Sequence, residues 1–198
     1  MNAPFCTPMT VDEYLTLAAR QQETGRSELI NGQAVAMSPE QSAHRQLKAR
    51  IFRALAESRA RMAAPCIVEP DGATVRIDDY TAYEPDALVY PGDRLPPDSL
   101  EVPAPVVVVE VISPTTRHLD TSAKLIGYFK VPSVQHYLIA DPDTPTLIHY
   151  QRTPTVGLRR SRERAARSAC QRPDCRSTST RYFVMQIDRL SRCRIGHP

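Results

Sequence analysis

Residues 84–90 read EPDALVY and residues 106–112 read VVVVEVI, and these two short apolar stretches decide how the chain is expected to fold. The second stretch does not alternate between apolar and polar residues, which predicts a central strand covered on both faces. Its one charged residue, Glu110, stands among valines and an isoleucine. An ionised carboxylate in such a strand costs several kcal/mol unless a cation or a metal accompanies it. Glu110 is therefore the first candidate for a functional residue.

A second carboxylate, Asp86, stands at the start of the other apolar stretch. Side chains alternate along a strand, so Glu110 is expected to share a face with Val108, and Asp86 with Leu88. If the two strands are neighbours, both carboxylates can bind one Mg²⁺, which prefers one or two carboxylates together with water and phosphate. Lys124 follows on an expected helix, where it can orient or deprotonate a water molecule or stabilise transition-state charge. Two carboxylates, a metal and a lysine are the working parts of a metal-dependent phosphodiesterase.

The remaining patterns predict an α/β or α+β domain. A capping-box spacing at Thr10 and Glu13 starts a short amphipathic helix. The dipeptide Asn31-Gly32 lies between apolar runs and predicts a two-residue hairpin turn. A second helix is expected to begin at the capping residue Ser38 and to run to about residue 61. Further strands are expected within 65–90 and over 106–112, a helix over 121–130, and two strands within 134–151, which together predict a mixed β-sheet flanked by helices.

The helix expected after Ser38 carries basic residues on the face opposite its apolar stripe. These residues are Arg45, Lys48, Arg50, Arg53, Arg59 and Arg61. A basic helix face is usually solvated, and that is the expectation here. The alternative is a surface that faces the phosphates of a nucleic acid. His44 has the same two interpretations, and we expect an ordinary position on the helix surface.

The charge of the chain changes sign near residue 150. Residues 1–150 carry 13 Lys and Arg against 19 Asp and Glu, whereas residues 151–198 carry 12 Arg, no Lys and 3 acidic residues. Residues 154–198 have no sustained apolar period, and only 181–187 could form a strand. We therefore divide the chain into a domain of residues 1–153 and an Arg-rich, disordered tail of residues 154–198. Its usage of Arg, Ser and Cys is typical of a GC-rich gene translated in a shifted frame, and the alternative is a nucleic-acid-binding arm.

Simple features argue against several other classes of protein. No apolar run is long enough to span a bilayer, and the N-terminus lacks the basic start and apolar stretch of a signal peptide. The five cysteines are scattered and form no CxxC pair. This favours reduced thiols over a disulfide framework or a zinc site. A cytoplasmic protein without membrane association is the expectation.

Several segments together resemble a known family, the Uma-two family of restriction-endonuclease-like proteins within the PD-(D/E)XK nuclease superfamily. The similar segments are SELINGQAVAMSP (27–39), EPDALVY (84–90), VVVVEVISPTTRHLDTSAKLIGYF (106–129) and VQHYLIAD (134–141). The resemblance spans about residues 10–152 and implies a restriction-endonuclease-like fold with a metal site at Asp86 and Glu110. It also implies Glu28 as a third acidic residue and Lys124 as a relocated lysine. The usual lysine position, two residues after the glutamate, is Ile112 here.

The sequence thus predicts a Mg²⁺- or Mn²⁺-dependent endonuclease that acts on DNA. Its predicted catalytic residues are Asp86, Glu110, Lys124 and Glu28, with Asp86 and Glu110 as the metal ligands. The main alternative is a non-catalytic nucleic-acid-binding or regulatory protein on the same scaffold, because a fold does not determine a function. The acidic charge of residues 1–150 mildly favours this alternative, since it opposes tight non-specific binding to DNA. A homodimer that cuts both strands is a further hypothesis.

Overall fold

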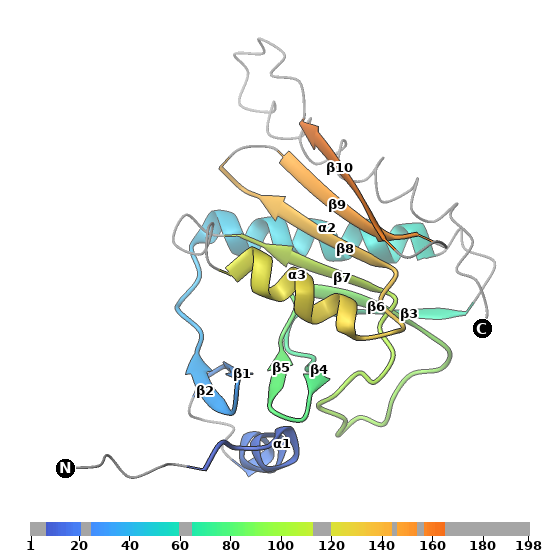
Figure 1. The fold of residues 1–198 in the computed structure, drawn as a ribbon. Helices are drawn as coiled ribbons and strands as arrows, with labels where there is room; N and C mark the ends of the chain where they lie inside the picture. Colours follow the sequence, from blue (N-terminus) through green and yellow to red (C-terminus); the bar gives the residue numbers. More distant parts are fainter. Residues whose placement is uncertain are drawn as a thin grey trace.

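The computed structural model describes residues 7–20, 25–59, 65–112, 120–143, 146–153 and 157–164, which form two β-sheets and three helices (Figure 1). The larger sheet has the strand order β10-β9-β8-β7-β6-β3. Its strands are β3 (Cys66–Pro70), β6 (Ala87–Pro91), β7 (Val107–Val111), β8 (His136–Asp141), β9 (Thr146–Arg152) and β10 (Leu158–Arg164). The smaller sheet has the order β2-β1-β5-β4, with β1 (Ser27–Ile30), β2 (Gln33–Ala36), β4 (Val75–Asp78) and β5 (Thr81–Tyr83).

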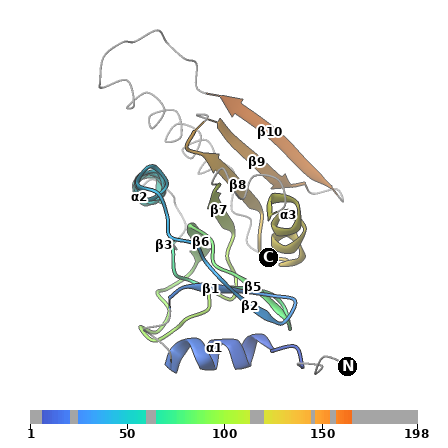
Figure 2. The ribbon, with the colours of Figure 1, turned by 90° about the vertical axis from the view of Figure 1, so that its left-hand side faces the viewer.

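Two helices cover opposite faces of the larger sheet, α2 (Ser42–Arg59) and α3 (Asp120–Lys130) (Figure 2). On the α2 face, Val109 of β7 packs in one buried cluster with Ile51. On the α3 face, Val108 packs in a second buried cluster with Tyr128. Strand β7 therefore lies in the middle of the molecule with both faces buried, as the unbroken valine run predicts.

The larger sheet is mixed. Strands β7 and β8 are parallel, and every other neighbouring pair described in this sheet is antiparallel. Parallel neighbours need a crossover connection, and α3 lies between them in the chain. The predicted mixed sheet flanked by helices is confirmed. Among the described residues, no helix is both long and apolar enough to cross a membrane.

The smaller sheet and α1 (Val11–Arg20) follow the local sequence signals closely. The capping box forms, because the Thr10 N–H donates to Glu13 Oε2 at 2.8 Å and the Glu13 N–H donates to Thr10 Oγ1 at 3.3 Å. The hairpin between β1 and β2 turns at Asn31 and Gly32, whose φ angles are 50° and 78°. A Cβ atom on Gly32 would lie 2.4 Å from Pro8 Cβ, so the turn also depends on the missing side chain. Helix α1 then packs on this sheet (Figure 1).

Helix α2 begins later than predicted, at Ser42 instead of Ser38. Glu40, which lies between these two positions, contacts side chains of α2 and is not itself part of the helix. Its carboxylate accepts a hydrogen bond from Lys48 Nζ at 2.6 Å, and its carbonyl accepts one from the Arg45 guanidinium. Glu40 also lies 4.0 Å from the guanidinium of Arg26, a residue of another segment, and a local capping signature does not show such a contact.

Regular structure continues past residue 153, where the sequence analysis placed the end of the domain. Strand β10 pairs with β9 over its whole length, from Leu158 opposite Arg152 to Arg164 opposite Thr146. An edge strand needs backbone hydrogen bonds but no apolar period, and this explains why the residue pattern did not predict it. Residues 165–198, including the strand expected over 181–187, lie outside the described residues, so the two hypotheses about the tail are untested.

Candidate active site

Asp86 and Glu110 stand on adjoining strands of the larger sheet. Strands β6 and β7 are antiparallel with Ala87 opposite Val109, so the same register brings Asp86, one residue before β6, opposite Glu110. The Asp86 N–H continues this pairing by donating to the Val109 carbonyl at 2.9 Å. The two strands are therefore neighbours, which a shared metal site requires.

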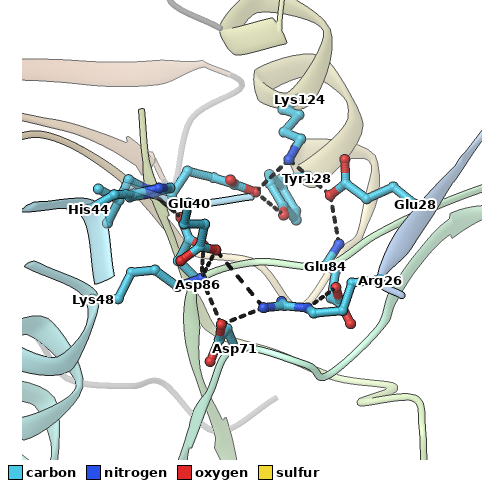
Figure 3. Close-up of polar contacts among 12 residues, drawn as sticks. Arg26, Glu28, Glu40, His44, Lys48, Asp71, Glu84, Asp86, Lys124 and Tyr128 are labelled. Carbon is cyan, nitrogen blue, oxygen red and sulfur yellow. Dashed lines mark hydrogen bonds and ion pairs between the residues drawn. The ribbon is translucent and has the colours of Figure 1, made fainter. Parts of the chain in front are cut away.

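Lys124 and Glu28 join this pair from two other elements. Lys124 is a buried residue of α3, and its Nζ lies 3.0 Å from Glu110 Oε1 and 2.9 Å from Glu28 Oε1. Glu28 is a buried residue of β1 in the smaller sheet and also accepts a hydrogen bond from the Glu84 N–H at 2.8 Å. Figure 3 shows Lys124 reaching down from α3 toward Glu28. The structure thus brings all four predicted site residues to the junction of the two sheets.

Tyr128 binds the Glu110 carboxylate from the apolar core. It lies one helical turn after Lys124, and its hydroxyl donates to Glu110 Oε1 at 2.6 Å. Its side chain is fully buried and contacts the rings of Tyr83 and Tyr137. Residues four positions apart lie on the same face of a helix, so Tyr128 and Lys124 both reach Glu110.

The largest difference from the sequence-based expectation is the burial of Lys48. This residue was assigned to a solvated basic face of α2, but it is only 6% exposed. Its Nζ lies 2.8 Å from Asp86 Oδ1 and 2.6 Å from both Glu40 Oε1 and Asp71 Oδ2. The pattern offered one signal, since Lys48 directly follows the buried Leu47 and precedes Ile51 by three positions, which places it at the border of the apolar stripe.

The carboxylate of Asp86 is held on the side of α2. Its Oδ2 accepts a hydrogen bond from the Val111 N–H at 2.6 Å and lies 3.7 Å from His44 Nε2, while Lys48 holds Oδ1. Leu88, however, packs on the face of the sheet that α3 covers. Asp86 and Leu88 therefore lie on different faces, contrary to the expectation from the sequence. Asp86 precedes β6, and its side chain is therefore not bound to the alternation of that strand.

An outer set of ion pairs continues the network around the junction (Figure 3). Arg26, which directly precedes β1, donates to Glu84 Oε2 at 2.8 Å and to the Asp71 carboxylate. Asp71 also accepts from Lys48, so the smaller sheet, the β3–β4 turn and α2 are linked by charge. In this network, the described residues contribute six carboxylates and three Lys or Arg side chains. The excess of negative charge favours the binding of a cation.

The environments of the two central carboxylates push their pKa values apart. Burial raises the pKa of Glu110 to about 8, although the Lys124 charge opposes this shift. Burial also acts to raise the pKa of Asp86, but the contacts with His44 and Lys48 outweigh it and hold this pKa below its ordinary value. The Asp86 contact in turn raises the pKa of His44 against the effect of burial. Asp86 is therefore the stronger acid of the two.

The raised pKa of Glu110 predicts that the free energy of unfolding falls as pH rises from about 4.5 to about 8. Between these pH values the Glu110 carboxyl is ionised in the unfolded chain but still protonated in the folded protein. Above about pH 8 it is ionised in both states, so the free energy of unfolding should not fall further through this group. Urea unfolding of the parent and of Glu110→Gln at a series of pH values across this window measures the effect. Glutamine does not titrate, so the variant should lack this part of the decline. Equal pH dependence in both proteins would contradict the assignment.

The residues at the junction fit a divalent cation of the Mg²⁺ type. Mg²⁺ is usually bound through one or two carboxylates and keeps the rest of its shell for water and phosphate. Asp86 and Glu110 stand opposite each other on neighbouring segments of the sheet, and among the described residues the buried His44 Nε2 beside Asp86 has no hydrogen-bond partner. Within the described residues, no three His, Cys, Asp or Glu side chains form a closed cation cluster. The donor set therefore suits an open site of two carboxylates.

Comparisons with known proteins agree with this architecture. A solved structure described as "a putative nuclease belonging to DUF820", from Anabaena variabilis ATCC 29413, is similar to the chain with a TM-score of 0.60 and 16% sequence identity. The similarity covers 93% of this chain and 99% of that chain, and at such low identity it shows a shared fold alone. No curated protein matches the chain significantly. The model of the Uma2 family, described as "Putative restriction endonuclease", matches residues 11–169, and the chain therefore belongs to the Uma2 family.

Proposed function

We propose that the protein is a Mg²⁺- or Mn²⁺-dependent endonuclease that hydrolyses phosphodiester bonds of DNA in the cytoplasm. The observation that carries this proposal is the meeting of Asp86, Glu110 and Lys124 at one buried junction, with Lys124 Nζ 3.0 Å from Glu110 Oε1. Paired carboxylates with an adjacent ammonium group are suited to phosphodiester hydrolysis, because this reaction needs an activated water molecule and stabilisation of phosphate charge. Membership of the Uma2 family supports the same conclusion.

Each residue of the junction has a role in the proposal. Asp86 and Glu110 would hold the cation, which supplies an acidified water molecule and neutralises phosphate charge. Lys124 would orient the water or stabilise charge on the phosphate. Glu28 holds the Lys124 ammonium at 2.9 Å, and Tyr128 holds the Glu110 carboxylate at 2.6 Å. These two residues are positioning residues.

The alternative is a nucleic-acid-binding or regulatory protein that uses the same scaffold without catalysis. One observation favours it: both central carboxylates already have lysine partners, Lys48 on Asp86 and Lys124 on Glu110. A site that is neutralised in this way can be purely structural. The presence or absence of metal-dependent cutting separates the two functions.

Incubation of supercoiled plasmid with the full chain is the direct test. We expect nicked and linear DNA with Mg²⁺ or Mn²⁺, and no cutting when a chelator removes the metal. Linear product that appears without a nicked intermediate would support a homodimer with one site for each strand. Binding of DNA without cutting under all metal conditions would reject the proposed function in favour of the alternative. Parallel reactions with single-stranded DNA and with RNA define the substrate class.

A further inference from the structure

Lys48 occupies a position that lysine rarely takes. It lies on the first half of α2 and is 6% exposed, although a lysine side chain normally keeps its ammonium group in water. Three carboxylates surround its Nζ: Asp86 at 2.8 Å, and Glu40 and Asp71 each at 2.6 Å. Burial of an ammonium group is costly unless it is fully paired, so this cluster is a specific site for one cationic side chain.

Lys48 also determines how Asp86 is held. One oxygen of Asp86 contacts Lys48 Nζ, and the other accepts the Val111 N–H at 2.6 Å. Rotation of the carboxylate would break at least one of these contacts. We propose that Lys48 is a positioning residue of the site. Its ammonium group serves as the counter-ion of the Asp86 carboxylate until a divalent cation binds Asp86 and replaces it.

The partners of Lys48 make such an exchange feasible. A divalent cation that binds Asp86 is repelled by a neighbouring ammonium group, so the two positive charges compete for the same carboxylate. If Lys48 moves away from Asp86, it keeps two acceptors, Glu40 and Asp71, at hydrogen-bond distance. Asp86 would then be free to bind the cation while its other oxygen stays on the Val111 N–H. The inference rests on the proposed metal site at Asp86 and Glu110.

The test compares metal binding of the full-length parent with that of Lys48→Met, which retains most of the side-chain length without the charge. Removal of the competing charge should tighten Mg²⁺ binding, measured by calorimetry, by about tenfold or more. Without metal the variant should unfold at a lower temperature than the parent, and added Mg²⁺ should raise its unfolding temperature by more. Lys48→Arg keeps the charge and should bind Mg²⁺ like the parent. Arg53→Met, an exposed position on the same helix, is the matched control.

A second variant has the opposite expected sign and does not depend on the stability of Lys48→Met. Glu40→Gln removes the negative charge of one of the two other carboxylates beside Lys48, so Lys48 should hold Asp86 more firmly and Mg²⁺ binding should weaken. Parent-like or weaker Mg²⁺ binding in Lys48→Met, or parent-like binding in Glu40→Gln, overturns the inference.

The plasmid assay keeps this inference separate from the proposed function. The predicted changes in Mg²⁺ affinity, found in a protein that cuts no DNA, would support the role of Lys48 and reject the nuclease. Cutting by the parent together with unchanged Mg²⁺ affinity in both variants would reject only the role of Lys48. No metal binding by any variant would overturn both the inference and the metal dependence of the nuclease.

Discussion

Glu110→Gln is expected to abolish cleavage of plasmid DNA, with a loss of rate on the order of 100- to 1000-fold or more. The substitution keeps the size of the side chain and a carbonyl that can accept the Tyr128 hydroxyl, but it removes the charge that the proposed cation needs. The expected loss is large because Glu110 lies at the centre of the site, mostly shielded from solvent, and Asp86 stands opposite it on the β6 side. Initial rates of plasmid nicking with Mg²⁺ measure the effect.

Asp86→Asn should cause a loss of the same order, since both carboxylates are proposed to hold one cation. Residues that act as a unit are not additive, so the double variant should be little worse than either single variant. Glu57→Gln is the matched control, because Glu57 is an exposed acidic residue of α2 and its loss should leave the rate unchanged. Cutting that survives both Asp86→Asn and Glu110→Gln would refute the proposed metal site.

Lys124→Met is expected to lower both the stability of the protein and its activity. The Lys124 ammonium is buried between Glu28 and Glu110, and its removal leaves two carboxylates without their cation. Breaking a buried ion pair from one side typically costs about 3–5 kcal/mol. Glu110 can bind a proton instead, because its pKa is already raised to about 8, so the loss should be smaller at low pH and larger above about pH 8. Urea unfolding at two pH values measures this dependence.

Two further variants distinguish the loss of the buried Lys124 from the effect of replacing any lysine of this helix. Lys130→Met removes an exposed lysine of the same helix, whose partner Asp78 is also exposed, and should change stability by no more than about 0.5 kcal/mol. Adding Glu28→Gln to Lys124→Met removes one of the two uncompensated carboxylates and should recover part of the stability. A Lys124→Met protein as stable as the parent at every pH would contradict the buried ion pairs.

Local chemistry was sufficient to predict much of the fold. The Asn31-Gly32 turn and the capping box that starts α1 depend on residues within four positions of each other, and both form as predicted. The valine run around Glu110 predicted a strand buried on both faces, because apolar residues without alternation must be covered on both sides. The later start of α2 was not predicted, and Glu40 just before it contacts both the helix and Arg26 of another segment. Strand β10 was not predicted, because it depends on backbone pairing with β9.

The residues of the site also differ in whether the sequence alone could identify them. Glu110 was recognisable as a candidate because a charge inside an apolar strand is costly wherever that strand lies, and this argument needs no partner. Lys48 was not recognisable, because its burial results from Glu40, Asp71 and Asp86, which come from three other parts of the chain. A helix pattern shows which residues share a face but not which distant carboxylates that face meets.

The sequence by itself determined most of the local elements up to residue 152 and the unusual position of Glu110, because these follow from residue types over short spans. Only the tertiary structure decided that Asp86 stands opposite Glu110 and that Lys124 of α3 joins Glu28 of β1 at the same junction. It also showed that Lys48, which was expected at the surface, is paired with the Asp86 carboxylate. The physical reason is that electrostatic partners are set by distance in space, and distance in space follows from strand register and helix packing.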